Sequence, residues 1–216
     1  MDTWIAAGLL MMGMTGNGLA QDIASIKLPP PQTTGGMPLM QALQERRSTR
    51  EFANRPLPPQ LLSNLLWAAN GVNRPDSGKR TAPTARDWRE IDVYVATAEA
   101  TYRYDPSSHA LIRVATGDLR RLTGMQDFVE TAPVNLVYVA DLKRTGADDA
   151  PERVARFVAA DAAFIAQNVY LFCASARLAT VVRGLVDRAA LGEALRLDGS
   201  QQVILAQSVG YPAETP

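Results

Sequence analysis

The chain has 216 residues, 47% of them hydrophobic, and its 22 basic and 22 acidic side chains give a formal net charge of zero. This length and apolar content suit one domain with one buried core, and the balanced charge excludes the strongly basic surface typical of nucleic-acid-binding proteins. A single cysteine excludes an internal disulfide, and a single histidine excludes a histidine-rich metal site.

Residues 1–20 look like a targeting segment rather than part of the folded domain. An apolar run over residues 5–14 is too short to span a membrane, and small residues follow it up to Ala20. We therefore predict a signal peptide cleaved after Ala20 and export to the periplasm, although no basic residue precedes the run. An N-terminal anchor or a cytosolic helix, with a cytoplasmic protein, is the alternative.

Residues 21–36 contain three consecutive prolines and then Thr-Thr-Gly-Gly. Proline runs are extended and Gly-rich runs are flexible, so this composition indicates a connection rather than a packed element. We expect either a linker or an extended N-terminal arm here. The folded domain is then predicted to occupy residues 37–216.

A short amphipathic helix opened by Pro38 leads into the string Arg46-Arg47-Ser48-Thr49-Arg50. We expect Arg46 and Arg47 in the last turn of this helix and Ser48 to Arg50 in the connection beyond it. Guanidiniums bind phosphate oxygens in pairs, and a serine hydroxyl adds a short hydrogen bond. The string therefore predicts a phosphate site, and the alternative is that the cations only offset the helix macrodipole.

The middle of the chain predicts a helix, a long loop and several strands. Residues 61–70 form an apolar stripe that stops at Asn70-Gly71. Residues 72–84 show no periodicity, and loops of this length are commonly functional. Residues 91–95 alternate as a strand, residues 101–105 and 110–114 form a hairpin, and residues 134–139 read as a central strand. His109 falls in the hairpin turn, where we expect it to be solvated.

A long helix follows, with Pro151 in its first turn and Asp148 or Asp149 as its cap. From residue 159 to 176 it is apolar on nearly every side, which predicts burial against the sheet and against a second subunit. Cys173 lies in this stretch and is expected to be an inert buried thiol. A helix beginning at Asp187 and a strand over 203–209 complete an α+β order.

Four segments in register resemble the nitroreductase family. R-R-S-x-R-x-F is similar to its FMN-phosphate signature, and residues 67–71, 80–85 and 181–184 follow at the family's spacing. With residues 102–106, the chain is most similar to the branch of the azoline-oxidising (SagB-type) dehydrogenases. The resemblance covers about residues 38–212. It implies a nitroreductase-like fold, with a central mixed or antiparallel sheet flanked by helices, in a homodimer with a long buried interface helix.

The resemblance also implies a cofactor site for FMN. Residues 46–50 would hold the phosphate, residues 83–87 would reach the flavin from the other subunit, residue 126 would touch its edge, and residues 182–184 would pass the isoalloxazine ring. The implied cofactor-binding residues are Arg46, Arg47, Ser48, Arg50, Pro83, Thr84, Ala85, Asp87, Gln126, Val182, Arg183 and Gly184.

Two of these residues depart from the family pattern. Asp87 stands where asparagine is usual, and the alternative is an ordinary surface carboxylate beside Arg86 and Arg89. Arg183 stands where glutamate is often found, and a cation beside flavin N1 or N5 would favour the reduced, anionic flavin.

The implied reaction is a hydride transfer through flavin N5 to a small electrophile such as a nitro, quinone or enone group, with no obligatory side-chain acid or base. NAD(P)H is a possible electron donor, although an exported enzyme would need another. The alternatives are an azoline-type dehydrogenase and a non-catalytic exported flavin- or ligand-binding protein.

Overall fold

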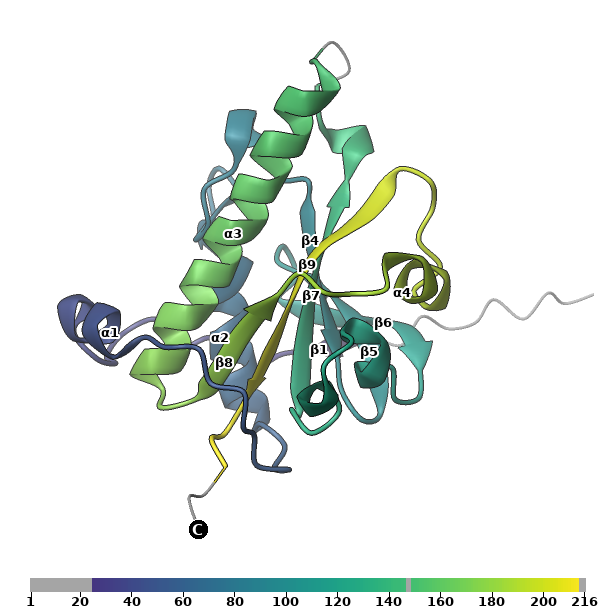
Figure 1. Cartoon of the computed structure of the whole chain (residues 1–216). Helices are drawn as coiled ribbons and strands as arrows, with labels where there is room; N and C mark the ends of the chain where they lie inside the picture. Colours follow the sequence, from purple (N-terminus) through teal and green to yellow (C-terminus); the bar gives the residue numbers. More distant parts are fainter. Residues whose placement is uncertain (1–24, 147–148, 214–216) are drawn as a thin grey trace, which may run out of the picture.

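The structure is a computed structural model that describes residues 25–146 and 149–213, so the predicted signal peptide lies outside the described residues (Figure 1). Its centre is a seven-stranded sheet in which neighbouring strands pair antiparallel. In spatial order the strands are β1 (Ser25–Lys27), β6 (Ala110–Thr116), β5 (Ala100–Asp105), β4 (Ile91–Ala96), β7 (Val134–Asp141), β9 (Gln201–Gly210) and β8 (Ala179–Arg183).

Helices lie on both faces of this sheet, which confirms the predicted α+β class. The helices are α1 (Leu39–Glu45), α2 (Pro59–Asn70), α3 (Pro151–Ser175) and α4 (Arg188–Ala194). Short 3-10 turns η1 (Ala85–Asp87), η2 (Arg120–Thr123), η3 (Asp127–Val129) and η4 (Leu142–Arg144) fill the connections. The predicted long loop carries a small hairpin of β2 (Val72–Arg74) and β3 (Lys79–Arg80) before η1.

Strand β7 shows why the sequence of a central strand is an almost continuous apolar run. Leu136 and Tyr138 point to the face covered by α2 and α3, whereas Val137 and Val139 point to the face covered by α4. All four side chains are fully buried. Because successive residues of a strand alternate between faces, a strand covered on both sides needs apolar residues at every position.

Helix α3 runs across the sheet and packs through one face only (Figure 1). Val158, Ala162 and Ile165 are buried on that face, whereas Ala159, Ala163 and Phe164 are exposed on the other. The expected burial on all sides is therefore not complete within one chain. By length and composition α3 would also suit a membrane span, but its buried residues belong to the domain core.

The start of α3 differs from the prediction. Ala150 precedes the helix without a side-chain cap, and the Asp149 carboxylate binds Arg86 and Arg153 instead. Asp149 is therefore not the cap, because ion pairs occupy its oxygens, and Asp148 lies outside the described residues. Cys173 is fully buried, as expected, and burial raises the pKa of its thiol.

The segment expected to be a linker or an arm lies along its own domain from Ser25 onward. Strand β1 pairs with β6, and Leu28 is buried in the main core. The Gln32 amide donates to Asn64 Oδ1 at 2.8 Å, and the Met37 amide donates to Ser175 Oγ at 2.8 Å. Residues 25–37 are thus fastened to α2 and to the end of α3.

His109 helps to hold this segment, so the expectation of a solvated histidine is wrong. Its Nε2 lies 2.7 Å from Ser63 Oγ and 3.1 Å from the Pro29 carbonyl oxygen, and its Nδ1 lies 2.8 Å from the Tyr104 hydroxyl. Burial lowers the pKa of His109. The composition of the turn did not predict this role, because Ser63 and Pro29 come from distant parts of the chain.

Candidate functional site

The segment Arg46–Arg50 runs beside β8, the edge strand of the sheet. Helix α1 ends at Glu45, so Arg46 is the first residue beyond it rather than part of its last turn. The Thr49 amide donates to the Thr180 carbonyl at 2.9 Å and fixes the segment to β8. Among the described residues, no carboxylate forms an ion pair with Arg46, Arg47 or Arg50.

Tyr170 of α3 joins this segment to the end of β8. The Val182 amide donates to the Tyr170 hydroxyl at 3.0 Å, and that hydroxyl lies 2.8 Å from Ser48 Oγ. Tyr170 accepts from Val182, and either hydroxyl can donate in its contact with Ser48; when Tyr170 donates, the Ser48 proton is free for a ligand oxygen. The Arg46 guanidinium also lies over the Tyr170 ring, 5.3 Å from its centre. Two predicted groups, the phosphate residues and residues 182–184, are thereby brought together.

Tyr170 and Arg177 are site residues that the sequence reasoning missed. Both line a hollow of about 400 Å³ beside the arginine segment, together with Arg47, Thr49 and Thr180. A hollow of this size is in the range of small-molecule sites. The available signal was Tyr170 itself, because a tyrosine on a buried helix face needs a partner for its hydroxyl.

The Arg183 side chain points into the protein. Its guanidinium donates to the Thr123 carbonyl at 2.6 Å and to Asn135 Oδ1 at 2.8 Å. Burial lowers the pKa of Arg183 to about 10. Gly124 makes room for this side chain, since a Cβ at that position would lie 1.8 Å from Arg183 Nη1. The Arg183 guanidinium, which was predicted to lie beside the flavin ring, is therefore hydrogen-bonded inside the protein.

Gln126 and Gly184 offer two features that suit a bound ligand. Gln126 Oε1 is buried and has no hydrogen-bond partner among the described residues. Gly184 is exposed, and a Cβ built on it would find its nearest neighbour, Leu205 Cδ2, only at 3.9 Å. A buried carbonyl without a donor normally calls for a partner, and an open glycine lets a flat ligand approach the backbone closely. The open backbone at Gly184 fits a flat cofactor such as a flavin, whereas Gln126 Oε1 is enclosed by protein in this structure.

Residues 83–87 contact α3 at Asp161, whereas the arginine segment contacts it at Tyr170. The Ala85 amide donates to Asp161 Oδ2 at 2.8 Å. Asp161 precedes Tyr170 by nine residues, which is roughly 14 Å along a helix. One chain therefore does not bring residues 83–87 to the arginine segment.

Asp87 behaves as part of a surface ion pair. Its two oxygens accept from Arg89 at 2.8 and 2.6 Å, and this hydrogen bonding is the main reason that the pKa of Asp87 is lowered. Arg86, Asp87 and Arg89 all have φ between 51° and 58°. Three left-handed residues within four positions are costly and are typical of functional loops.

A model of the nitroreductase family matches residues 43–211. The chain belongs to the nitroreductase family. A Methanocaldococcus jannaschii protein assigned to the nitroreductases is 30% identical over 186 residues, which cover 82% of this chain and 92% of that protein. A structure from Ralstonia eutropha with the same assignment is 45% identical, has a TM-score of 0.84 and is matched over 97% of each chain.

The NADPH:FMN oxidoreductase of Vibrio harveyi, solved with NAD+, is similar at a TM-score of 0.61 and 20% identity, over 82% of this chain and 70% of that one. At this identity the likeness concerns the fold alone. Membership of the family makes the chain a flavin-dependent oxidoreductase.

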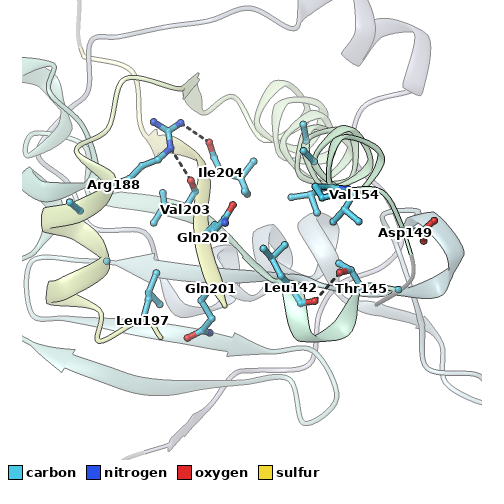
Figure 2. A pocket seen from close by; sticks show the side chains of 17 residues that line it. Leu142, Thr145, Asp149, Val154, Arg188, Leu197, Gln201, Gln202, Val203 and Ile204 are labelled. Carbon is cyan, nitrogen blue, oxygen red and sulfur yellow. Dashed lines mark hydrogen bonds between the residues drawn. The ribbon is translucent and has the colours of Figure 1, made fainter. Parts of the chain in front are cut away.

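A second, larger hollow is lined by Val154, Arg188 and Val203, among others (Figure 2). It has a volume of about 890 Å³ and lies between the first turns of α3, helix α4 and the start of β9. Val154, Leu197 and Val203 give it apolar walls. Arg188 donates to the Val203 carbonyl at 3.0 Å and to the Gly184 carbonyl at 3.3 Å, so it connects the hollow to residues 182–184. No residue of the predicted cofactor set lines it.

Proposed function

We propose that the chain is an FMN-dependent oxidoreductase that reduces a small electrophile, such as a nitro, quinone or enone compound, and that NAD(P)H is a candidate electron donor. The observation that carries the proposal is the contact from Ser48 through Tyr170 to Val182, which joins a cationic segment to an open backbone turn at the end of an edge strand.

The arginine segment supplies the charge that a phosphate needs. A phosphate monoester is nearly a dianion at neutral pH, and here the end of α1 offers only the negative pole of a helix dipole. Side-chain cations must therefore supply the attraction. Arg46, Arg47 and Arg50 have no ion-pair partner among the described residues that would compete for them, and Ser48 has a hydroxyl proton to donate.

The part of the site that would contact the isoalloxazine ring consists mainly of backbone groups. Bound flavin would supply two-electron chemistry at its N5. The chain would place Gly184, with its open side, against the ring and would offer Gln126 as a polar contact at the ring edge. The Val182 amide is already engaged by Tyr170, and Arg183 pairs with Ala206 in the β8–β9 ladder, so the Gly184 amide is the better donor for the ring.

We also propose that the active form is a homodimer. The exposed face of α3 carries alanines and Phe164, whose side chain is 46% exposed. A second copy packed on this face would remove apolar surface from water. It would also bring residues 83–87 of one chain toward the arginine segment of the other, which a single chain does not do.

The larger, apolar hollow is a candidate substrate site. Its walls are mostly aliphatic, and Arg188, the one basic residue among the described residues that line it, already donates to three backbone carbonyls. Such walls favour a neutral and largely apolar electrophile over a highly charged one. Reduction is the proposed direction, with azoline oxidation and flavin binding without turnover as the outcomes that a test must separate.

The absorption spectrum of the purified protein tests this proposal. We expect a yellow protein, or a colourless one that takes up added FMN, that NADH or dithionite bleaches and that a quinone re-oxidises. Protein that takes up no FMN contradicts the proposal. A flavin that reduces but that no quinone, nitro or enone compound re-oxidises favours binding without turnover, and reduction of the flavin by an azoline favours the dehydrogenase.

Export after cleavage at Ala20 is a separate proposal, since residues 1–20 lie outside the described part of the chain. It is tested by fractionating cells that express the full chain and determining the first residue of the mature protein. A periplasmic product that begins at Gln21 supports export. A cytoplasmic product with the first residues intact contradicts it.

A further inference from the structure

Two buried carboxyl groups lie beneath the turn of residues 83–85. Glu90 precedes β4 and is fully buried, and Asp161 sits in the middle of α3 with 3% of its surface exposed. Both line a small cavity together with Thr84. Within the described residues, neither carboxyl forms an ion pair. Two carboxyls that line one small cavity and form no ion pair cannot both be ionised at low cost.

The contacts of this pair fix the turn. Asp161 Oδ2 accepts from the Ala85 amide at 2.8 Å, and Glu90 Oε2 accepts from Thr84 Oγ1 at 3.2 Å. Thr84 Oγ1 in turn accepts from the Arg89 amide at 3.0 Å. The other oxygen, Glu90 Oε1, is buried without a partner among the described residues. Each carboxyl thus holds one residue of the turn, immediately before the left-handed residues that follow it.

Neighbouring groups do not neutralise the pair. Arg89 binds Asp87, and Asn70 at the end of α2 donates to the Ile91 carbonyl. Arg80 of β3 also lines the cavity, but it forms no ion pair within the described residues, and burial lowers its pKa. Burial, together with the nearby Asp161 carboxyl, raises the pKa of Glu90 from 4.5 to about 7.

We propose that Glu90 and Asp161 share one proton, and that this proton holds residues 83–85 in the position from which they contact the flavin of the partner subunit. Glu90 is then a positioning residue, because it touches the turn and not the cofactor. The second half of the proposal rests on the proposed function. Loss of the proton leaves two buried carboxylates that repel each other, and the turn that both of them hold is loosened.

The sign of the pH dependence follows from the raised pKa of Glu90. The folded chain keeps a proton that the unfolded chain has released between about pH 4.5 and pH 7. Glu90 therefore contributes stability that is complete below this window and is lost as the pH rises through it. FMN held by residues 83–85 should weaken in the same direction.

The test compares the wild-type chain with Glu90→Gln, and with the exposed Glu193→Gln as a matched control. A glutamine side chain in place of Glu90 is neutral at every pH and keeps an oxygen for Thr84. The first readout is the unfolding midpoint in urea across the pH window, measured without FMN. The second is the FMN dissociation constant of the wild type divided by that of Glu90→Gln at the same pH, a ratio from which titration of the FMN phosphate cancels. We expect this ratio to rise about tenfold from pH 6 to pH 8, which corresponds to one pKa unit.

The two readouts separate the possible failures. Parallel unfolding profiles in wild type and Glu90→Gln overturn the shared proton. A flattened unfolding profile with a constant ratio of FMN dissociation constants confirms the proton and overturns the positioning role. Protein that takes up no FMN at any pH contradicts the proposed function and the positioning role together, while the unfolding readout still decides the shared proton. If Glu90→Gln does not fold, Asp161→Asn keeps an acceptor for the Ala85 amide and leaves Glu90 buried and titratable, so it must narrow the pH window of the unfolding profile. An unchanged window overturns the shared proton.

Discussion

Replacing Arg183 by methionine distinguishes a buried structural arginine from a cation that tunes a flavin. Arg183 bonds the Thr123 carbonyl and Asn135 Oδ1, and its side chain passes the space left by Gly124. Methionine has a similar length but donates no hydrogen bond. The substitution therefore removes the charge and the hydrogen bonds while it keeps much of the packing.

The expected loss of stability follows from the groups left behind. The Thr123 carbonyl loses its donor, and an unpaired buried acceptor costs about 1–3 kcal/mol. Asn135 Oδ1 is better protected, because Ser208 Oγ also donates to it at 2.6 Å. Burying the guanidinium is itself unfavourable, as the lowering of the Arg183 pKa to about 10 shows. We expect a net loss of about 2 kcal/mol.

The assay is urea unfolding of the protein without FMN, followed by measurement of the flavin potential in the reloaded protein. Arg183→Met should lower the unfolding free energy and leave the potential nearly unchanged. Arg188→Met is the control, because Arg188 is exposed and bonds only backbone carbonyls, and it should cost less. Unchanged stability with a more negative flavin potential would show that the guanidinium faces the ring and refute this reasoning.

Three further substitutions test separate parts of the site. Tyr170→Phe removes the hydroxyl that the Val182 amide donates to, so we expect FMN affinity, measured by titration, to fall about fivefold to tenfold, or 1–1.4 kcal/mol. Gly184→Val should fold normally and lose FMN binding, whereas Gly199→Val, also at an open position, should retain it. Phe164→Asp should give a monomer in sedimentation experiments, because it places a charge on the apolar face of α3.

The sequence was sufficient for most of the fold because its strongest signals are local. The alternation in residues 91–95, the apolar run of β7 and the Asp187 cap of α4, whose carboxylate accepts from the Ala190 amide, all depend on neighbours in the chain. The predictions for the start of α3 and for His109 were wrong because some of the partners are distant in the sequence. Arg86 binds Asp149, and Ser63 and the Pro29 carbonyl contact His109.

In the candidate site too, local signals were predicted and distant contacts were not. The arginine string was readable because several cations and a hydroxyl gather within five positions of the sequence. Tyr170 was not, since on a helix it looks like one more core residue until its hydroxyl is found between Ser48 and Val182. The direction of Arg183 was equally hidden, because it depends on the space at Gly124. A sequence motif shows which residue types lie close together in the chain. The direction in which a side chain points depends on how the protein packs around it.

The central claim is that the arginine segment binds the phosphate of FMN. Calorimetric titration of the Ser48→Ala, Arg50→Ala double variant with FMN and with riboflavin, which lacks the phosphate, tests it most directly. The exposed Arg113→Ala is the control. We predict about a 100-fold loss of FMN affinity, the equivalent of one or two charge-assisted hydrogen bonds, with unchanged riboflavin binding and an intact fold. Unchanged FMN affinity, or an equal loss for both ligands, would contradict the claim.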